Sequence, residues 1–222
     1  MVRIASIVEG HGECEAVPIL VRRIAQTLDP ALAPSVHPVL RVPAARLLKQ
    51  GEIERAVELA ARKNSGQGGI LVLLDCDDGC PAQEAPELLK RAVTARANLP
   101  VSVVMAKREY EAWFLAAAES LRGQRGLPAD LIAPERPEDI RGAKEWLAEQ
   151  MPRGQTYSES SDQPALTAVF DMNAARRADS FDKCYREIVR LLNLLRDPNP
   201  KGRTTTNSSK ARCPAETNDP SG

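Results

Sequence analysis

The stretch that most constrains the fold is residues 2–15, with the sequence VRIASIVEGHGECE. An apolar segment precedes a Gly-His-Gly turn, which is the pattern of a short buried strand that leads into a helix. Glu9 therefore stands at the carboxyl end of the expected strand. In an open α/β sheet ligands bind at that edge, because the loops there carry polar groups while the strands stay apolar. The segment predicts an α/β fold and the place of its chemistry.

A second apolar run is followed by acidic residues. Residues 70–74, ILVLL, lead into the sequence DCDDG, which contains Asp75 and Asp77. An uninterrupted apolar run is typical of a central parallel strand that is covered on both faces. Because parallel strands end at the same edge of a sheet, we expect Asp75 and Asp77 to lie near Glu9.

Hydrophobic periodicity predicts four strands that alternate with helices, and further helices after the fourth strand. The expected strands are residues 2–8, 36–42, 70–74 and 101–105, and the expected helices are residues 14–28, 47–63, 84–97, 106–121, 140–150, 164–172 and 181–195. This order predicts an α/β fold with a mostly parallel four-stranded sheet flanked by helices, and additional C-terminal helices. Tyr110, Trp113 and Phe114 share one helical face, which predicts a place in the core.

The chain is expected to have three parts. Residues 1–121 form an α/β core, residues 122–196 form a helical extension packed on the core, and residues 197–222 lack apolar periodicity and are expected to be a disordered tail.

Composition restricts the function without naming it. The chain carries 30 basic and 30 acidic side chains, so its formal net charge is zero and no general positive charge indicates autonomous nucleic-acid binding. No apolar run reaches the roughly 20 residues of a membrane span, and the first residues lack a basic and apolar signal pattern, so we expect a cytoplasmic protein. Five cysteines at irregular spacing do not form the paired pattern of a structural zinc site.

Three carboxylates from two strand ends, Glu9, Asp75 and Asp77, are the expected centre of the chemistry. Asp75 and Asp77 point the same way if the strand geometry persists. Crowded carboxylates repel one another, and Mg²⁺ or Mn²⁺ converts this repulsion into coordination. Glu13, one helical turn past Glu9, is expected as a ligand of a second metal or as the base that activates water. The alternative for each acid is a solvated loop or helix-cap position.

The segments VEGHGECE and LLDCDDG resemble the Toprim signature of the topoisomerase and primase superfamily, in which a glutamate ends the first strand and a DxD motif ends the third. The later segments REYEAWFL, GAKEWL, DQPALTAVFD and AARRADSF are similar to a family of small stand-alone Toprim-like bacterial proteins of unknown function. The resemblance covers nearly all of residues 2–195. It implies a Toprim-like fold in which Glu9, Asp75 and Asp77 bind metal for phosphodiester chemistry.

Related nucleases add acids and a lysine after the fourth strand, where this chain has Lys107, Glu109 and Glu111. The resemblance implies that Glu111, in preference to Glu109, carries a second metal. It also implies that Lys107 neutralises phosphate charge as the leaving group departs. An exposed helix start is the alternative for Lys107 and Glu109. The family pattern also includes Lys144, Asp162, Asp171 and Arg176, for which packing or substrate contact is the only expected role.

These residues predict a metal-dependent nuclease that uses Mg²⁺ or Mn²⁺ on DNA or RNA. One alternative is a haloacid-dehalogenase-like phosphatase with Asp75 as nucleophile. Another is a non-catalytic module that binds nucleic acid or protein. The resemblance permits a separate ATPase subunit in a mobile-element or phage-defence system, and no GxxxxGK[ST] loop occurs in this chain. The sequence leaves open the preferred metal, endo or exo cleavage, and homo-oligomer formation.

Overall fold

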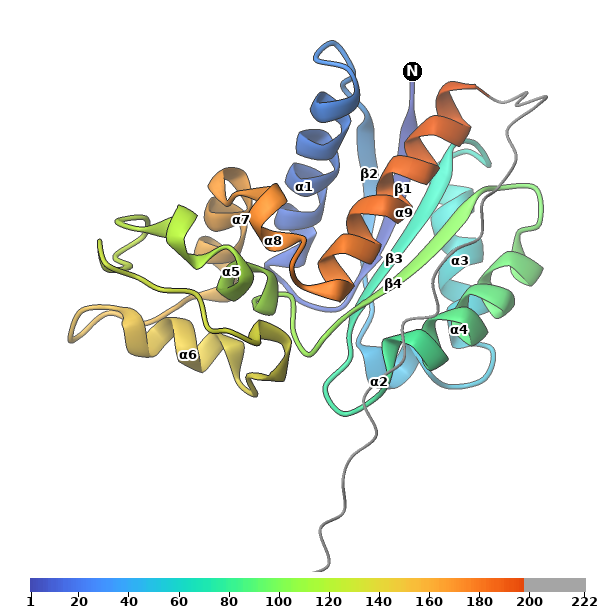
Figure 1. Ribbon diagram of the computed structural model, residues 1–222. Coiled ribbons are helices and arrows are strands. Elements are labelled where there is room, and N and C mark those ends of the chain that lie inside the picture. Colours follow the sequence, from blue (N-terminus) through green and yellow to red (C-terminus); the bar gives the residue numbers. More distant parts are fainter. Residues whose placement is uncertain (198–222) are drawn as a thin grey trace, which may run out of the picture.

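The computed structural model describes residues 1–197 and contains one four-stranded parallel sheet (Figure 1). The strands are β1 (Arg3–Val8), β2 (Ser35–Arg41), β3 (Gly69–Asp75) and β4 (Val101–Ala106). Their order across the sheet is β2-β1-β3-β4, and every neighbouring pair is parallel. The predicted α/β fold with C-terminal helices is confirmed. The predicted tail falls, apart from Asp197, outside the described residues.

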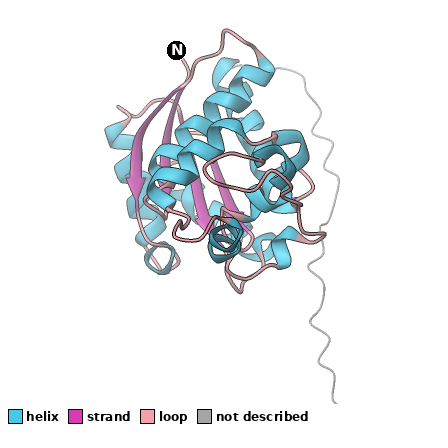
Figure 2. Ribbon diagram, turned by 90° about the vertical axis from the view of Figure 1, so that its left-hand side faces the viewer, coloured by secondary structure: helices cyan, strands magenta, loops and turns pink. Residues whose placement is uncertain are grey.

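Helices cover both faces of the sheet, so the strands lie between helices (magenta in Figure 2). The helices are α1 (Glu13–Leu28), α2 (Ala44–Leu47), α3 (Glu52–Lys63), α4 (Pro81–Ala95), α5 (Ala112–Ala116), α6 (Ala143–Gln150), α7 (Glu159–Val169), α8 (Met172–Ala175) and α9 (Asp179–Arg196), with 3₁₀ turns at Ala118–Leu121 and Pro137–Asp139. Within residues 1–197, no helix is long and apolar enough to cross a membrane.

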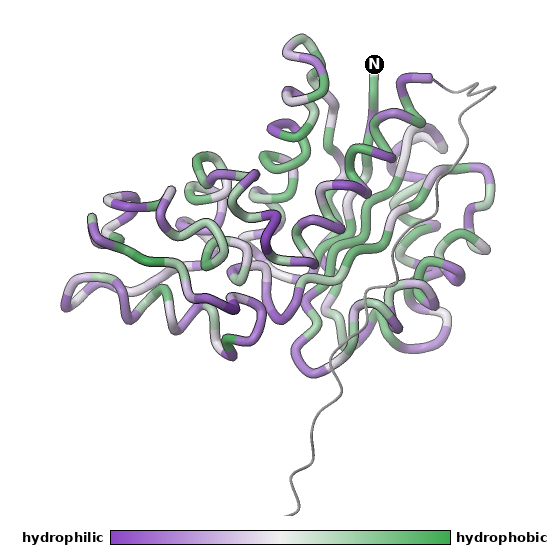
Figure 3. The backbone as a smooth tube through the Cα atoms, viewed as in Figure 1, coloured by the Kyte–Doolittle hydropathy of each residue, from purple (hydrophilic) through white to green (hydrophobic). Residues whose placement is uncertain are grey.

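The apolar run of β3 is explained by burial on both sides. Leu71 and Leu73 join the core cluster under α1 and α9, whereas Ile70, Val72 and Leu74 join the cluster under α3 and α4. Successive side chains of a strand point to opposite faces, so a strand covered on both faces is apolar at every position. Figure 3 shows hydrophobic residues along the strands and hydrophilic ones in the loops at their ends.

The connections that leave the carboxyl ends of β1 and β3 run in opposite directions along the sheet. From β1 the chain passes through α1 to β2 on one side, and from β3 it passes through α4 to β4 on the other side. Ile7 pairs with Val72, so the register brings Glu9, two residues later, close to Asp75. Ligands of open α/β sheets bind at such a switch point, because the loops separate there.

The predicted helix over residues 47–63 is interrupted. Gly51 has a φ of 81° and separates α2 from α3, because a left-handed residue cannot continue a helix. Ile53 and Val57 are buried as expected, but Leu48 and Leu59 are 45% and 47% exposed.

The predicted helix over residues 106–121 is wrong in its first part. Pairing between β3 and β4 continues to Asp75 and Ala106, so residue 106 belongs to the strand. The backbone amide of Cys76 donates hydrogen bonds to the carbonyls of Ala106 and Arg108, at 2.9 and 3.0 Å. These bonds hold residues 107–111 as a loop against the end of β3, and α5 begins only at Ala112.

An aromatic cluster joins the helical extension to the core. It consists of the buried rings of Tyr110, Trp113, Phe114, Phe170 and Phe181. The centroids of neighbouring rings lie between 4.5 and 5.6 Å apart. The prediction that the first three belong to the core is confirmed. Helix α9 also packs directly on β4.

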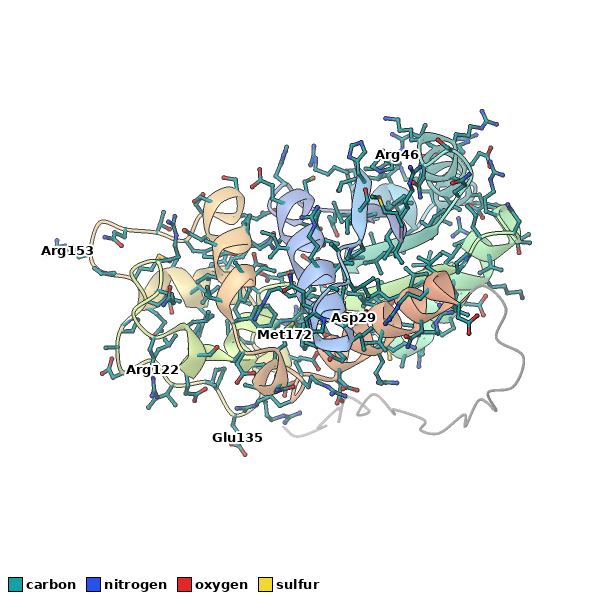
Figure 4. The ribbon with its side chains drawn as sticks, turned by 90° about the horizontal axis from the view of Figure 1, so that it is seen from above. Asp29, Arg46, Arg122, Glu135, Arg153 and Met172 are labelled. Atoms are coloured by element: carbon teal, nitrogen blue, oxygen red, sulfur yellow. The ribbon has the colours of Figure 1, made fainter. Side chains whose placement is uncertain are left out.

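The part of the extension that precedes α9 lies to one side of the sheet, whereas α9 covers the sheet (Figure 1). Seen from above, Arg122, Glu135 and Arg153 lie at one end of the molecule and Arg46 of α2 lies toward the other (Figure 4).

Candidate functional site

Four carboxylates gather near the carboxyl ends of β1 and β3, and we call Glu9, Glu13, Asp75 and Glu111 the acidic cluster. Glu9 follows β1, Glu13 opens α1, Asp75 ends β3, and Glu111 directly precedes α5. The charge of Asp75 interacts with the charges of the other three. Glu13 is 2% exposed and Glu111 is fully buried. The fold therefore concentrates negative charge at the switch point of the sheet.

Backbone amides hold three of the four carboxylates. Glu13 Oε2 accepts hydrogen bonds from the amides of Glu9 and Gly10, both at 2.8 Å. Glu9 Oε2 accepts from the amide of Asp75 at 3.3 Å, and Asp75 Oδ1 accepts from the amide of Tyr110 at 2.9 Å. Glu13 is thus held within its own turn, whereas the bonds of Glu9 and Asp75 link the β1–α1 turn, the end of β3 and the loop before α5.

Side chains of the helical extension hold the fourth carboxylate. Glu111 Oε1 accepts hydrogen bonds from the Tyr157 hydroxyl at 2.8 Å and from Gln163 Nε2 at 3.0 Å. Lys144 Nζ lies 4.0 Å from Glu111 Oε2 and 3.5 Å from Glu159 Oε2. The extension therefore supplies the groups that surround one side of the acidic cluster.

Burial raises the pKa of Glu13, Asp75 and Glu111. The pKa of Glu13 rises to about 7, since burial outweighs the hydrogen bonds from the amides of Gly10 and Glu9. The pKa of Glu111 also rises to about 7 through burial, against the lowering effects of Lys144 and the Tyr157 hydrogen bond. Burial and then the charges of Glu13 and Glu111 raise the pKa of Asp75 well above its usual range. The metal-free cluster therefore holds protons close to neutral pH.

Lys144 is the ammonium group that faces this cluster. Burial lowers its pKa, but the charges of Glu111, Asp75 and Glu159 outweigh burial, so the pKa is raised. Its side chain is 35% exposed, which leaves the ammonium accessible from solvent. Lys144 is therefore charged at neutral pH.

The structure does not bring Asp77 into the acidic cluster. The strand ends at Asp75, so the strand geometry on which the expected alignment of the two aspartates depended does not persist to Asp77. Asp77 is exposed, and its carbonyl accepts a hydrogen bond from the Arg108 side chain. The next residue, Asp78, pairs with Arg141 at 2.7 Å. Arg108 and Arg141 thus bind the loop that contains the DxD motif, which was expected to bind a metal.

Lys107 and Glu109 lie on the loop after β4. The Lys107 amide donates a hydrogen bond to Ser180 Oγ at 3.1 Å, and no ion pair joins its ammonium to an acid within residues 1–197. Glu109 Oε2 accepts a hydrogen bond from the Lys144 amide at 3.4 Å. Glu109 thus contacts the residue that faces the cluster, whereas Glu111 lies in the cluster itself.

Three residues of the family pattern have local structural contacts. Asp162 pairs with Arg125 at 2.7 Å and accepts the Ser158 amide at 2.8 Å. Asp171 caps α8 by accepting the amides of Asn173 and Ala174. Arg176 pairs with Asp182 at 2.7 Å. These contacts order the ends of α7, α8 and α9.

Sequence reasoning did not identify Tyr157, Gln163 and Glu159, and it left Lys144 without a role. The segments GAKEWL and DQPALTAVFD contain Lys144 and Gln163, so the resemblance marked two of these positions. No periodicity shows that residues 144–163 fold back onto the turn at residues 9–13.

Carboxylate oxygens are suitable ligands for a divalent metal, but those of the cluster are not gathered around one point. In the part of the chain that the structure describes, no group of three or more His, Cys, Asp or Glu side chains is arranged so that it could hold a metal ion. However, Glu13 Oε1 and Glu111 Oε2 are buried without a hydrogen-bond partner. Buried carboxylate oxygens without a partner are costly, and they are the ligands that Mg²⁺ and Mn²⁺ prefer.

Comparisons with known proteins give one match. A family model described as a domain of unknown function, DUF4276, matches residues 8–188. No curated protein and no solved structure matches the chain. The matched segment contains the acidic cluster and the groups of the extension that contact it. Since the match covers most of the chain, the protein belongs to the DUF4276 family.

Proposed function

We propose that this protein is a Mg²⁺- or Mn²⁺-dependent nuclease that hydrolyses phosphodiester bonds of DNA or RNA at the acidic cluster. The observation that carries the proposal is the set of carboxylates from three segments at the switch point, faced by Lys144, with two buried oxygens that lack a hydrogen-bond partner. The resemblance of VEGHGECE and LLDCDDG to Toprim motifs supports the same chemistry.

The metal would be held by Glu9, Asp75 and Glu111, which stand after β1, at the end of β3 and directly before α5. When bound, the cation stabilises negative charge on the phosphate and lowers the pKa of water. Binding would also displace the protons that burial keeps on the cluster near pH 7. Asp77, which the sequence placed in this set, is exposed in a loop and is not part of the proposed site.

Two other residues have roles that follow from their atoms. Glu13 Oε1 has no hydrogen-bond partner, and the pKa of Glu13 is about 7, so it is suited to accept the proton of the attacking water. Lys144 is charged and partly exposed beside Glu111, so its ammonium is placed to contact a phosphate oxygen. We assign this role to Lys144 in place of Lys107, because Lys107 makes no ion pair with the cluster in residues 1–197.

The zero net charge of the chain affects how it could bind nucleic acid. A protein that binds nucleic acid alone usually presents a basic surface, because phosphate contacts supply most of the affinity. We therefore include a separate subunit, such as an ATPase of a mobile-element or phage-defence system, as a source of nucleic-acid affinity.

A non-catalytic interaction module is the second proposal. It is favoured by the lack of a preformed metal site within residues 1–197. The two proposals differ in whether the acidic cluster binds Mn²⁺ at millimolar concentration.

The experiment is cleavage of plasmid DNA and single-stranded RNA in the presence of Mg²⁺ or Mn²⁺. We expect the wild-type protein to cleave at least one of them, and we expect Asp75→Ala and Glu9→Ala to abolish cleavage. Asp77→Ala separates the structural cluster from the sequence motif, and we expect it to retain most activity because Asp77 is exposed. The matched control is Asp139→Ala, which removes a surface aspartate that pairs with Arg136.

Undiminished cleavage by Asp75→Ala or Glu9→Ala would contradict the assignment. Thermal melting of each variant without metal shows whether a loss of cleavage comes from unfolding. Calorimetric titration with Mn²⁺ distinguishes the two proposals, since only the nuclease requires the metal.

A further inference from the structure

The two carboxylate oxygens of Glu111 have different surroundings. Oε1 accepts two hydrogen bonds, from the Tyr157 hydroxyl at 2.8 Å and from Gln163 Nε2 at 3.0 Å. Oε2 is buried and has no hydrogen-bond partner, and Lys144 Nζ lies 4.0 Å away. A carboxylate with one oxygen held by two donors cannot rotate freely, so the direction of the second oxygen is fixed.

Both donors come from the helical extension. For Gln163, the close approach of α7 to the start of α1 depends on a glycine. Gly12 lies at the start of α1, and its amide donates a hydrogen bond to Glu159 Oε1 at 3.3 Å. A Cβ atom at Gly12 would overlap the Glu159 carbonyl oxygen and Gln163 Oε1. The first turns of α7 can therefore lie against the β1–α1 turn only because residue 12 has no side chain. This contact places the Gln163 side chain within hydrogen-bond distance of Glu111.

Tyr157 approaches Glu111 by a second route. It precedes α7, which begins at Glu159, and residues 152–156 before it are exposed. Its hydroxyl proton is directed to Glu111, and burial together with the charge of Glu111 raises the Tyr157 pKa, so the hydroxyl remains a donor. Two side chains, one just before α7 and one within it, thus hold one oxygen of the same carboxylate.

We propose that Tyr157 and Gln163 are positioning residues that hold Glu111 Oε1 and thereby direct Glu111 Oε2 toward a divalent cation at the acidic cluster; this inference rests on the proposed function. Outer hydrogen-bond partners of metal ligands orient the ligand, and their loss typically costs about 10- to 100-fold in metal affinity. The extension is then a part of the metal site, although none of its residues other than Lys144 faces the cation.

A purely structural role predicts a different result. If the hydrogen bonds only satisfied a buried carboxylate, removing one would lower the melting temperature by about 2–4 °C and leave metal affinity unchanged. A positioning role lowers metal affinity even when the fold is kept. Metal affinity is therefore the quantity that separates the two roles.

The test is calorimetric titration of the full chain with Mn²⁺. Tyr157→Phe removes one donor and keeps the ring, and Gln163→Met removes the other donor at similar size. We expect each variant to bind Mn²⁺ about tenfold more weakly than the wild type. The matched control is Tyr185→Phe, whose hydroxyl lies 2.9 Å from Thr27 Oγ1 at the surface, and which should bind Mn²⁺ like the wild type.

A second measurement uses the cleavage reaction. For Tyr157→Phe we expect the Mn²⁺ concentration that gives half the maximal rate to rise about tenfold, while KM for the nucleic acid at saturating Mn²⁺ stays unchanged. Melting temperatures without metal confirm that each variant is folded, and if Tyr157→Phe does not fold, Gln163→Met alone decides the question.

Two results would overturn the inference. If Tyr157→Phe and Gln163→Met bind Mn²⁺ as tightly as the wild type while Asp75→Ala does not bind it, the positioning role is wrong and the proposed metal centre stands. If the wild type does not bind Mn²⁺, both the inference and the proposed function fail.

Discussion

Two groups of acidic side chains in this protein are neutralised in opposite ways. On α3, Glu52, Glu54 and Glu58 lie at the surface and pair with arginines. The pairs are Arg46–Glu52 and Arg55–Glu52 at 2.5 Å, Arg62–Glu58 and Arg96–Glu58 at 2.6 Å, and Arg91–Glu54 at 2.8 Å. Hydrogen bonds from these arginines hold the pKa of all three glutamates below the ordinary value.

At the acidic cluster, by contrast, burial raises the pKa of Glu13, Asp75 and Glu111. The positive charge of Lys144 acts on Asp75 and Glu111, and its Nζ lies 4.0 Å from Glu111 Oε2. The chain thus uses arginine where acids contribute to stability, and it leaves repulsion in place at the switch point of the sheet. This difference supports the proposal that the cluster binds a divalent cation.

The largest expected effect is a fall in the metal-free stability of the protein as the pH rises. The folded-state pKa of Glu13 is about 7, above its ordinary value of 4.5, so the folded state binds more protons than the unfolded state between these values. The free energy of unfolding therefore decreases as the pH rises from about 4.5 to about 7, by about 3 kcal/mol for this one group. Urea denaturation with a chelator at pH 5, 6, 7 and 8 measures it.

Two additions sharpen this prediction. Glu13→Gln removes the titrating group, so we expect a shallower pH dependence and a more stable metal-free protein at pH 8. Mn²⁺ should restore stability at pH 8, because it binds the folded state. A stability that does not change between pH 5 and pH 8 would show that burial does not raise the pKa of Glu13.

The second prediction concerns Lys144. Lys144→Met leaves the carboxylates of Glu111 and Glu159 without their cation, so we expect a loss of about 1–2 kcal/mol in the free energy of unfolding at pH 7.5, reduced by the partial exposure of the lysine. We also expect cleavage to fall about 100-fold or more, since a charge next to the phosphate is lost.

The control for this change is Lys183→Met. Lys183 Nζ lies 2.7 Å from Glu187 Oε1, but its side chain is 50% exposed, so we expect a loss below about 0.5 kcal/mol and no change in cleavage. Equal losses of stability in the two variants would remove the distinction between the cluster and the surface.

Much of the sheet could be predicted from the sequence because β1, β3 and β4 are largely apolar local segments. Residues 70–74 are buried on both faces, and a continuous apolar pattern is sufficient to identify such a strand. The start of the helix after β4 could not be predicted in this way, because strand pairing with β3 takes Ala106 and the loop that follows is held by the Cys76 amide. Those are contacts between segments that local periodicity does not record.

The same distinction applies to the site. Glu9 and Asp75 could be predicted, since both stand at ends of strands that lie side by side. The place of Asp77 could not, because it depends on where the strand stops and on the loop contact with Arg108. Tyr157 and Gln163 reach Glu111 across 46 and 52 residues of chain, and only the packing of α7 on the β1–α1 turn brings them there.

The smallest expected effect comes from α3, and the change in stability there has the opposite sign to the change expected at the acidic cluster. Glu54 accepts two hydrogen bonds from Arg91, at 2.8 and 2.9 Å, which join α3 to α4. Glu54→Gln should therefore lower the free energy of unfolding by about 0.5 kcal/mol, with a smaller loss in 1 M salt, because surface ion pairs contribute little and are screened. At pH 8 without metal, Glu13→Gln removes the same charge and should raise the stability instead. Urea denaturation of both variants checks the two signs, and destabilisation by both would mean that the buried charge of Glu13 does not lower the stability at pH 8.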